Sequence, residues 1–415
     1  MVQFIVSMIN LYIFNEVSRA AVYGVGTYIK ELVTALKNSN INICVVHLRS
    51  EKPDEESEKS ENIRHWYIPS PIGRNVSLDW EQQSELYFRN VVYLLQMDIK
   101  DTNNLIFHLN FNQSGKLIEK LRESFACKIT TTIHYLNWCF SLSGNILRFR
   151  ELIANLNDSE EYIKKDFLKE KEFFKLPDKV ICLSEVTQNI IQNDYKIKKS
   201  NISLIYNGLR DEKINISKKE LRKKYNIPLN VPVFLHVGRL DENKGLNYVI
   251  SAFKQVLTIF PRSHLFIAGS GSYDIYLKKC EDIWLNITFT GRLEKFKLYE
   301  FYSLADIGLM PSFTEQCSYV AIEMMMHGLP LIASTSTGLK EMIEDGVCGL
   351  HIPVTEYLDR AEIDSSLLAE KMLYLLQHPE ERKQMGKNAR KRYKKLFSSE
   401  IMGRKMTELY HSLFE

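Results

Sequence analysis

Short apolar runs that alternate with longer stretches of helical periodicity constrain the fold of this chain more than any other feature. Most runs are nearly all apolar, which is typical of strands that are covered on both faces. In the first half the runs are 4–9, 43–48, 105–109, 129–133 and 180–183. In the second half they are 233–237, 265–268, 287–290, 307–310 and 331–333. We therefore predict an α/β fold with two Rossmann-like, doubly wound parallel sheets.

The length of 415 residues and a break in the apolar pattern indicate two domains. A polar, lysine-rich stretch at 210–230 lies between the last run of the first half and the first run of the second. We place the boundary at Asn207-Gly208, which gives an N-terminal domain at 1–207 and a C-terminal domain at 208–398.

The charge balance argues against a nucleic-acid-binding protein. The formal net charge is only +3, with 54 Lys and Arg against 51 Asp and Glu, whereas nucleic-acid binders usually carry a basic patch. The one basic run, at 390–395, fits either the solvated face of a helix or a contact with an anionic membrane surface or partner. We expect no nucleic-acid partner and keep a peripheral membrane contact open.

Cysteine usage indicates a reducing compartment. The seven cysteines are odd in number and scattered, and no CxxC pair occurs. The apolar opening at 1–14 has no basic residue before it and is interrupted by Asn10, which favours a first strand over a targeting segment. No stretch reaches the roughly 18 apolar residues that span a membrane. The expected location is cytoplasmic.

Two positions in the first half are candidate ligand contacts. Gly24 follows the first strand region and precedes a helical stretch at 27–37. Glycine lets backbone approach a ligand and a helix start favours an anion, but a plain strand-to-helix turn has the same pattern. His134 follows the run 129–133 at its carboxyl end, where open α/β sheets bind ligands. A satisfied structural histidine fits that position as well.

Two cations follow the first run of the second half directly. Arg239 and Lys244 come after the run 233–237. Arginine offers a fork for phosphate oxygens and lysine a compact charge, so the pair suits a diphosphate, although surface cations are common.

Two carboxylates and a helix start follow a later strand. The segment 315–334 predicts a helix from about Ser318, a stop at Gly328 and then another strand. Glu315 precedes this helix and Glu323 lies early within it, so both can face the crevice where the strands end. Carboxylates there can accept hydrogen bonds from sugar hydroxyls, while the helix start offers amides to phosphate. Taken alone, Glu323 also fits an exposed helix residue.

No metal site and no cofactor are expected. No two histidines share metal-ligand spacing, and no Asp-x-Asp motif occurs.

These segments, in this order, resemble the retaining glycosyltransferases of family 4, the glycosyl transferases group 1 class with the GT-B fold. The resemblance covers nearly the whole chain and is densest over 233–349. There His-Val-Gly-Arg-Leu, Lys-Gly, Ile-Ala-Gly-Ser-Gly, Phe-Thr-Gly-Arg, Ala-Asp-Ile-Gly-Leu-Met-Pro-Ser and Glu-x7-Glu stand in the family's order.

The resemblance implies a bacterial, cytoplasmic, metal-independent enzyme that transfers a sugar with retention of configuration. The donor would be a UDP- or GDP-linked sugar, and the acceptor a glycan, a lipid-linked molecule or a peptide. Arg239 and Lys244 would hold the donor diphosphate, Glu323 the ribose hydroxyls and Glu315 the hydroxyls of the transferred sugar. His134 would lie near the donor sugar.

The same resemblance places Gly24 in the loop that meets donor and acceptor, and the final helix, at 399–415, back on the N-terminal domain. Glycines of the family are replaced by Tyr23, Ser318 and Thr337, each where backbone approaches the donor. Bulkier residues there would narrow the choice of donor or weaken activity. A noncatalytic, sugar-nucleotide-binding GT-B subunit is therefore the alternative, and an epimerase or phosphorylase of similar fold matches the motifs less well.

A long helical insertion at 136–177 follows His134. We expect it to choose the acceptor, because the donor contacts lie mainly in the other domain. Its aromatic residues Trp138, Phe140 and Phe149 either offer stacking surface beside the cleft or bury against the first domain.

Overall fold

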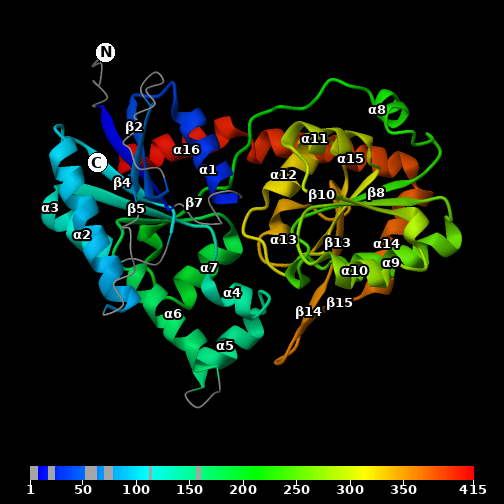
Figure 1. Ribbon diagram of the computed structural model, residues 1–415, viewed down its shortest axis with the longest axis horizontal. Helices are drawn as coiled ribbons and strands as arrows, with labels where there is room; N and C mark the ends of the chain where they lie inside the picture. The colour runs from blue at the N-terminus through cyan, green and yellow to red at the C-terminus, as the bar shows by residue number, and fades with distance from the viewer. Residues whose placement is uncertain (1–7, 17–23, 52–62, 70–77, 112–114, 156–159) are drawn as a thin grey trace. The chain divides into compact units, whose positions relative to one another are not determined.

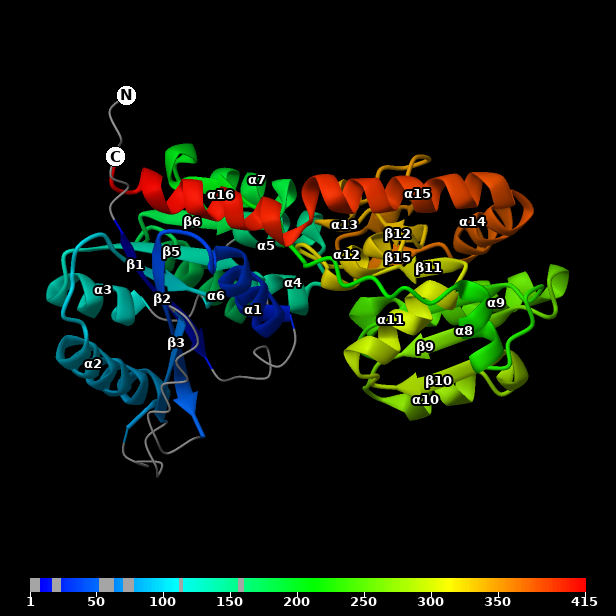
Figure 2. The same cartoon turned by 90° about the horizontal axis from the view of Figure 1, so that it is seen from above.

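The computed structural model describes residues 8–16, 24–51, 63–69, 78–111, 115–155 and 160–415. They divide into two compact units, each built on a parallel sheet (Figures 1 and 2). Unit 1 comprises Met1–Leu136, Lys164–Gly208 and Ser399–Glu415, and unit 2 comprises Asn137–Ile163 and Leu209–Ser398. The predicted α/β fold with two Rossmann-like parallel sheets is confirmed.

Unit 1 contains a seven-stranded sheet with the order β3-β2-β1-β4-β5-β6-β7. Its strands are β1 (Ile9–Glu16), β2 (Ile41–Ser50), β3 (Ile63–Pro69), β4 (Leu105–Leu109), β5 (Cys127–Ile133), β6 (Lys179–Cys182) and β7 (Ile202–Leu204). Its helices are α1 (Gly24–Leu36), α2 (Trp80–Asp98), α3 (Gly115–Ser124), α6 (Glu161–Phe173), α7 (Glu185–Asn193) and α16 (Ser399–Ser412), with α1 packed on α16 and α2 on α3. The strand order reverses between β1 and β4, so ligands are expected at that switch point.

The first strand begins later than the predicted run 4–9, most of which lies outside the described residues. Asn10 breaks the apolar pattern, but its side chain is buried and its Nδ2 donates to the carbonyl of Asn103 at 3.0 Å. The strand β1 therefore continues to Glu16 with its polar group satisfied.

Unit 2 contains a six-stranded sheet with the order β10-β9-β8-β11-β12-β13. Its strands are β8 (Val233–Val237), β9 (His264–Ala268), β10 (Ile287–Gly291), β11 (Ile307–Met310), β12 (Leu331–Ser334) and β13 (Gly349–Ile352), with a separate hairpin of β14 (Val354–Glu356) and β15 (Ala361–Ile363). Its helices are α4 (Asn137–Ser141), α5 (Ile146–Ala154), α8 (Lys218–Lys224), α9 (Leu246–Ile259), α10 (Tyr273–Lys279), α11 (Lys295–Leu304), α12 (Tyr319–Met326), α13 (Leu339–Met342), α14 (Ser365–Gln377) and α15 (Pro379–Leu396). The strand order reverses between β8 and β11.

The segment Asn137–Ile163 belongs to unit 2, although it follows a strand of unit 1 and was expected in the N-terminal domain. The buried side chain of Asn145 donates to the carbonyls of Tyr357 and Arg360 at 2.6 and 3.0 Å. These bonds attach the start of α5 to the hairpin β14–β15. Tertiary contacts more than 200 residues away therefore decide where this segment packs.

The aromatic residues of this segment are mostly core. Trp138 and Phe149 are 2% and 0% exposed, and their rings stack with centroids 4.2 Å apart. The interpretation of these two rings as ligand-stacking surface is therefore wrong, because both rings are buried. Phe140 is exposed.

A buried polar network joins four elements of unit 1. His108 on β4 is fully buried, with Nε2 2.7 Å from Oγ1 of Thr132 on β5 and Nδ1 2.6 Å from the hydroxyl of Tyr410 on α16. The hydroxyl of Tyr28 on α1 lies 3.1 Å from the same Thr132 oxygen. Burial lowers the pKa of His108 to about 3, and the nearby His134 acts in the same direction. His108 is therefore neutral near pH 7.

We predict that His108 makes unit 1 sensitive to acid. In an unfolded chain a histidine titrates near pH 6.5, so the unfolded state takes up a proton that folded His108 refuses until about pH 3. The stability that neutral His108 supplies is complete above pH 6.5 and is lost as the pH falls toward 3. Between pH 7 and pH 5 the loss should be about 2 kcal/mol.

Urea unfolding of wild type and His108→Gln at pH 7 and pH 5 measures this loss. The stability difference between the two proteins should shrink by that amount at pH 5, because glutamine does not titrate. If the stability difference between wild type and His108→Gln is the same at both pH values, His108 is not the group whose protonation destabilises unit 1.

Candidate functional site

The carboxyl edge of the unit 2 sheet gathers the loops that carry most of the predicted site residues. β8 and β11 are neighbouring parallel strands, with Phe234 opposite Ile307, and β12 lies on the other side of β11. The loops that follow these strands therefore begin at the same edge of the sheet, next to the switch point between β8 and β11. Arg239 and Lys244 follow β8, and Glu315 follows β11.

Glycines let these loops meet backbone to backbone. Gly269, with φ of +155°, faces the carbonyl of Gly238, and a Cβ on Gly269 would lie 1.7 Å from that oxygen. A Cβ on Gly338 would likewise lie 1.7 Å from the carbonyl oxygen of Gln316. Real Cβ contacts are never this short, so only glycine fits, and the loop backbones are fixed relative to one another.

A short 3-10 turn, Glu242–Lys244, presents Lys244. The turn begins where the Asp241 side chain accepts the Lys244 backbone N–H at 3.2 Å, and it ends at Gly245 in the left-handed conformation with φ of +68°. A Cβ on Gly245 would lie 2.0 Å from the carbonyl of Pro311, so this position also requires glycine.

The structure brings Lys244 and Glu315 together as an ion pair. The Lys244 Nζ lies 2.5 Å from the Glu315 Oε1, and the two side chains are only 20% and 14% exposed. An ion pair in this setting is shielded from solvent and stronger than a pair at the open surface. A cation and a carboxylate that the sequence predicted separately therefore form one group.

Thr337 anchors the backbone of Glu315. The Thr337 Oγ1 accepts the Glu315 N–H at 2.8 Å and donates to the Glu315 carbonyl at 2.5 Å, and the N–H of Gly338 donates to that carbonyl at 2.7 Å. A glycine at 337 could make neither side-chain bond. The departure from the family's glycine pair thus has a structural role here.

Arg239 is the most exposed predicted site residue of unit 2. Its side chain is 44% exposed, and its Nη2 lies 3.1 Å from the Asp241 Oδ2. An exposed ion pair of this kind contributes little to stability, so it can exchange readily for a ligand phosphate.

The helix α12 carries Ser318 and Glu323. Ser318 occupies the N-cap position and makes no side-chain capping bond. The Glu323 Oε2 accepts a hydrogen bond of 2.8 Å from the hydroxyl of Tyr302 on α11, which is 1% exposed. Burial, and then the charge of Glu323, raise the pKa of Tyr302 well above its usual value, so Tyr302 keeps its proton and donates it. Glu323 is therefore held by the fold and is not a free surface carboxylate.

His134 and Gly24 lie in unit 1. His134 follows β5, and its Nε2 lies 3.0 Å from the Oδ1 of Asn110, whose Nδ2 donates to the carbonyl of Phe14 at 3.2 Å. Because the Asn110 oxygen accepts, the His134 Nε2 carries the proton. Burial lowers the pKa of His134, which favours the neutral imidazole.

Gly24 is the first residue of α1, and a Cβ placed there would meet nothing within 4 Å. The described fold therefore does not itself require glycine at this position. Tyr23, the replaced family glycine beside it, lies outside the described residues.

Sequence reasoning missed Asn110, Tyr302 and the anchoring role of Thr337. Asn110 could have been found, because it directly follows the run 105–109, as His134 follows 129–133. Tyr302 stands within a helix and carries no signal that distinguishes it from a core tyrosine.

In the described ranges, no group of three or more His, Cys, Asp and Glu side chains is placed to hold a metal ion. Among the same residues, no helix is both long and apolar enough to cross a membrane.

Comparison with known proteins identifies the family. Residues 22–213 match the family described as Glycosyltransferase Family 4, and residues 217–392 match Glycosyl transferases group 1. Among solved structures, sucrose-phosphate synthase from Thermosynechococcus elongatus superposes with a TM-score of 0.77 at 22% identity and covers 98% of this chain and 99% of its own. The Anabaena protein HepE, solved in complex with UDP and glucose, gives 0.71 at 15% identity and covers 97% and 99%. The chain belongs to the family 4 glycosyltransferases, with the GT-B fold.

Curated relatives match over part of their length. A GDP-mannose-dependent monoacylated alpha-(1-6)-phosphatidylinositol monomannoside mannosyltransferase of Corynebacterium glutamicum is 32% identical over 203 residues, which cover 47% of this chain and 51% of the relative. A lipopolysaccharide 1,2-N-acetylglucosaminetransferase of Salmonella typhimurium is 28% identical over 193 residues, which cover 43% and 50%. The chain thus spans about half the length of these curated relatives.

We predict that Tyr302→Phe destabilises unit 2 by about 1–3 kcal/mol, because a partly buried carboxylate, Glu323, loses the hydrogen bond from Tyr302. Tyr374→Phe is a matched control, since it removes a tyrosine bond to Glu381 on the surface. That variant should lose less than about 0.5 kcal/mol. If denaturant unfolding gives the two variants equal losses of unfolding free energy, the Tyr302 hydrogen bond stabilises unit 2 no more than a surface bond does.

Proposed function

We propose that the protein is a retaining, metal-independent glycosyltransferase that moves a sugar from a UDP- or GDP-linked donor to a glycan or lipid-linked acceptor. The observation that carries the proposal is the shielded Lys244–Glu315 pair at the switch point of the unit 2 sheet. It puts a cation suited to phosphate beside a carboxylate suited to sugar hydroxyls, both on loops that the fold holds in place.

In the proposed cycle the bound donor separates Lys244 from Glu315 and gives each of them a new partner. The Lys244 ammonium leaves Glu315 for the diphosphate, and the Glu315 carboxylate then accepts hydrogen bonds from the sugar hydroxyls. Because each charged group gains a new partner as it loses the old one, binding leaves neither charge buried and unpaired. Arg239 adds a second cation to the diphosphate, and the two neutralise the charge that grows on it as the glycosidic bond breaks.

Glu323 would accept hydrogen bonds from the ribose hydroxyls. Tyr302 holds one carboxylate oxygen of Glu323, and the carboxylate has further lone pairs for a ligand. A carboxylate that is already oriented loses less conformational freedom when the nucleotide binds.

The transfer step needs no base from the protein. The bond from the anomeric carbon to the phosphate oxygen breaks, and the acceptor oxygen bonds that carbon on the same face. The acceptor's proton passes to an oxygen of the departing phosphate. Neutral His134 would hydrogen bond near the donor sugar without adding charge. The one-bond C1–H1 coupling of the product in an NMR spectrum tests retention, because it distinguishes the anomers of gluco- and manno-configured sugars alike.

Names of similar proteins support this donor and acceptor class. The Anabaena structure contains UDP and glucose, and the Corynebacterium relative is named as GDP-mannose-dependent, so both nucleotides remain in the proposal. The two curated relatives are named for phosphatidylinositol monomannoside and lipopolysaccharide, which favours a glycan or a lipid-linked acceptor over a peptide. A cytoplasmic location, with peripheral contact at the inner membrane face, is part of the proposal.

We predict that the double variant Arg239→Ala, Lys244→Ala loses turnover by about a thousand-fold or more, because preorganised charge on the leaving group supplies much of the rate. The matched control, Lys223→Ala with Arg262→Ala, removes two exposed cations elsewhere in unit 2 and should keep wild-type turnover. The turnover of both double variants is measured as the release of nucleoside diphosphate from a panel of UDP- and GDP-sugars.

The same assay tests metal independence. Turnover should persist in EDTA, because the two cations take the role of a divalent ion. Activity that EDTA abolishes and manganese restores would contradict this part of the proposal.

A further inference from the structure

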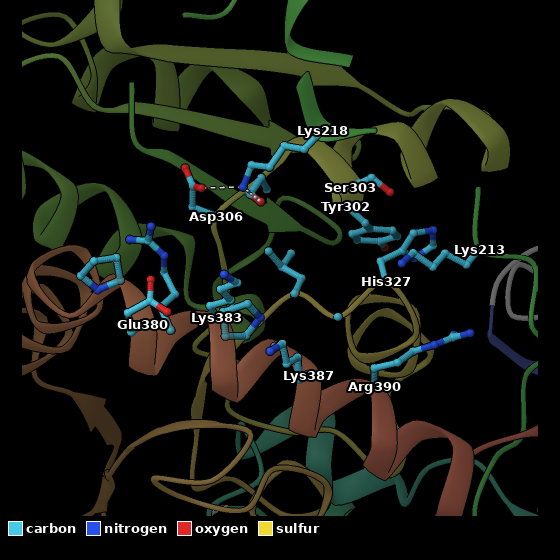
Figure 3. A pocket seen from close by; sticks show the side chains of 17 residues that line it. Lys213, Lys218, Tyr302, Ser303, Asp306, His327, Glu380, Lys383, Lys387 and Arg390 are labelled. Atoms are coloured by element: carbon cyan, nitrogen blue, oxygen red, sulfur yellow. Dashed lines mark hydrogen bonds and ion pairs between the residues drawn. The ribbon is translucent and has the colours of Figure 1, made fainter. Parts of the chain in front are cut away.

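Unit 2 contains a cavity of about 640 Å³ at the edge of its sheet opposite to the Lys244–Glu315 pair (Figure 3). Asp306 and Pro330 line it, and they directly precede β11 and β12. They therefore mark the amino ends of strands whose carboxyl ends lead to Glu315 and Thr337. The helix α15 forms one wall, and α8 and the end of α11 form another. Its size is within the range of small-molecule sites.

The lining of this cavity is strongly basic. Six cations line it, against the two carboxylates Asp306 and Glu380: Lys213, Lys218, Arg382, Lys383, Lys387 and Arg390. Asp306 is already neutralised, because Lys218 and Arg222 lie 2.5 and 2.6 Å from its two oxygens. Arg390 pairs with Asp211, which lies outside the lining. The cations of the lining without an ion pair in the described part of the chain are therefore Lys213, Arg382, Lys383 and Lys387.

Lys383 and Lys387 are the cations most available to a ligand. They stand four residues apart on α15, so they share one face of that helix. Both are exposed, and neither side chain has a hydrogen bond or an ion pair within the described part of the chain. Figure 3 shows them on the α15 side of the cavity, with Lys218 on the opposite wall. Like charges at this spacing repel, so an anion between them would be stabilising.

Close backbone packing fixes the wall that carries these lysines. A Cβ on Gly386, between Lys383 and Lys387, would lie 2.3 Å from the carbonyl oxygen of Gly328. Arg390 ties the same helix to α12, because its Nη1 donates to the carbonyl of Met326 at 2.7 Å. The lysines thus project from a rigid support and need not be ordered by a ligand.

His327 is a buried histidine in the wall of this cavity. It lines the cavity and is only 8% exposed. Its Nδ1 donates to the Glu323 carbonyl at 2.8 Å, whereas its Nε2 is buried and has no hydrogen-bond partner in the described ranges. Because Nδ1 carries the proton, Nε2 offers only a lone pair, which accepts from a donor group and does not bind a phosphate oxygen. The case for an anion therefore rests on the basic lining.

We propose that this cavity binds a phosphate-bearing anion of about diphosphate to triphosphate size, at a site separate from the donor site. Lysine ammonium groups suit phosphate oxygens as compact charges, and several of them on facing walls match a ligand that carries several negative charges. The phosphate belongs either to a free small molecule or to a lipid headgroup.

Calorimetric titration with inorganic tripolyphosphate tests the site. Lys383→Ala with Lys387→Ala should weaken binding at least about ten-fold, equivalent to about 1.4 kcal/mol. Lys391→Ala with Lys394→Ala is the matched control, because it removes the same charge from exposed positions of α15 outside the cavity lining. Equal weakening in both double variants would overturn the proposal, since it would indicate a general charge effect.

Tripolyphosphate could also bind at Arg239 and Lys244, so the titration is repeated in the Arg239→Ala, Lys244→Ala background. Binding that persists there and depends on Lys383 and Lys387 supports a separate site whether or not the proposed function holds. If tripolyphosphate no longer binds in the Arg239→Ala, Lys244→Ala background, the proposal of a separate site is overturned. Co-sedimentation with phosphatidylglycerol vesicles then separates the sources: a lipid headgroup predicts vesicle binding that tripolyphosphate displaces, and a free ligand predicts none.

Discussion

The geometry of unit 2 depends on backbone contacts that only glycine permits. Gly269 against Gly238 and Gly338 against Gln316 leave no room for a Cβ, so the loops at the carboxyl edge pack directly on one another. The contact of Gly338 with Gln316, together with the two hydrogen bonds of the Thr337 hydroxyl, fixes the position of the Glu315 backbone. Glycine costs conformational entropy on folding, but here it secures a close approach that side chains would prevent. The ion pair of Lys244 and Glu315 is therefore a consequence of loop packing as much as of charge attraction.

Much of the sheet architecture could be predicted from the sequence. The runs 233–237 and 307–310 coincide with β8 and β11, because strands buried on both faces are almost wholly apolar. The edge strands β3 and β13 interrupt this pattern with other residues. β3 contains Arg64 and His65, and β13 contains Gly349 and His351, so neither was predicted. The placement of Asn137–Ile163 in unit 2 rests on bonds from Asn145 that no local pattern reveals.

The candidate site was predictable where it follows strand ends. Arg239, Lys244 and Glu315 each come shortly after a predicted strand, and the shared edge of a parallel sheet explains why Lys244 and Glu315 meet. Partners that come from other elements were not predictable. Tyr302 reaches Glu323 from α11, and its position within that helix resembles that of any core aromatic residue. The basic cavity was not predicted, because only Arg390 of the basic run 390–395 lines it and because Lys213 and Lys218 lie far from α15 along the chain.

Calorimetric affinities for UDP and GDP, compared with those for uridine and guanosine, test the central claim most directly. The claim is that Lys244, freed from Glu315, binds the diphosphate of the donor. Wild type should bind the cognate nucleoside diphosphate at least about a hundred-fold more tightly than its nucleoside, and Lys244→Ala should reduce that preference at least about ten-fold. The affinity for the nucleoside itself should not change. A preference of the same size in both proteins would show that the Lys244–Glu315 pair has no part in donor binding.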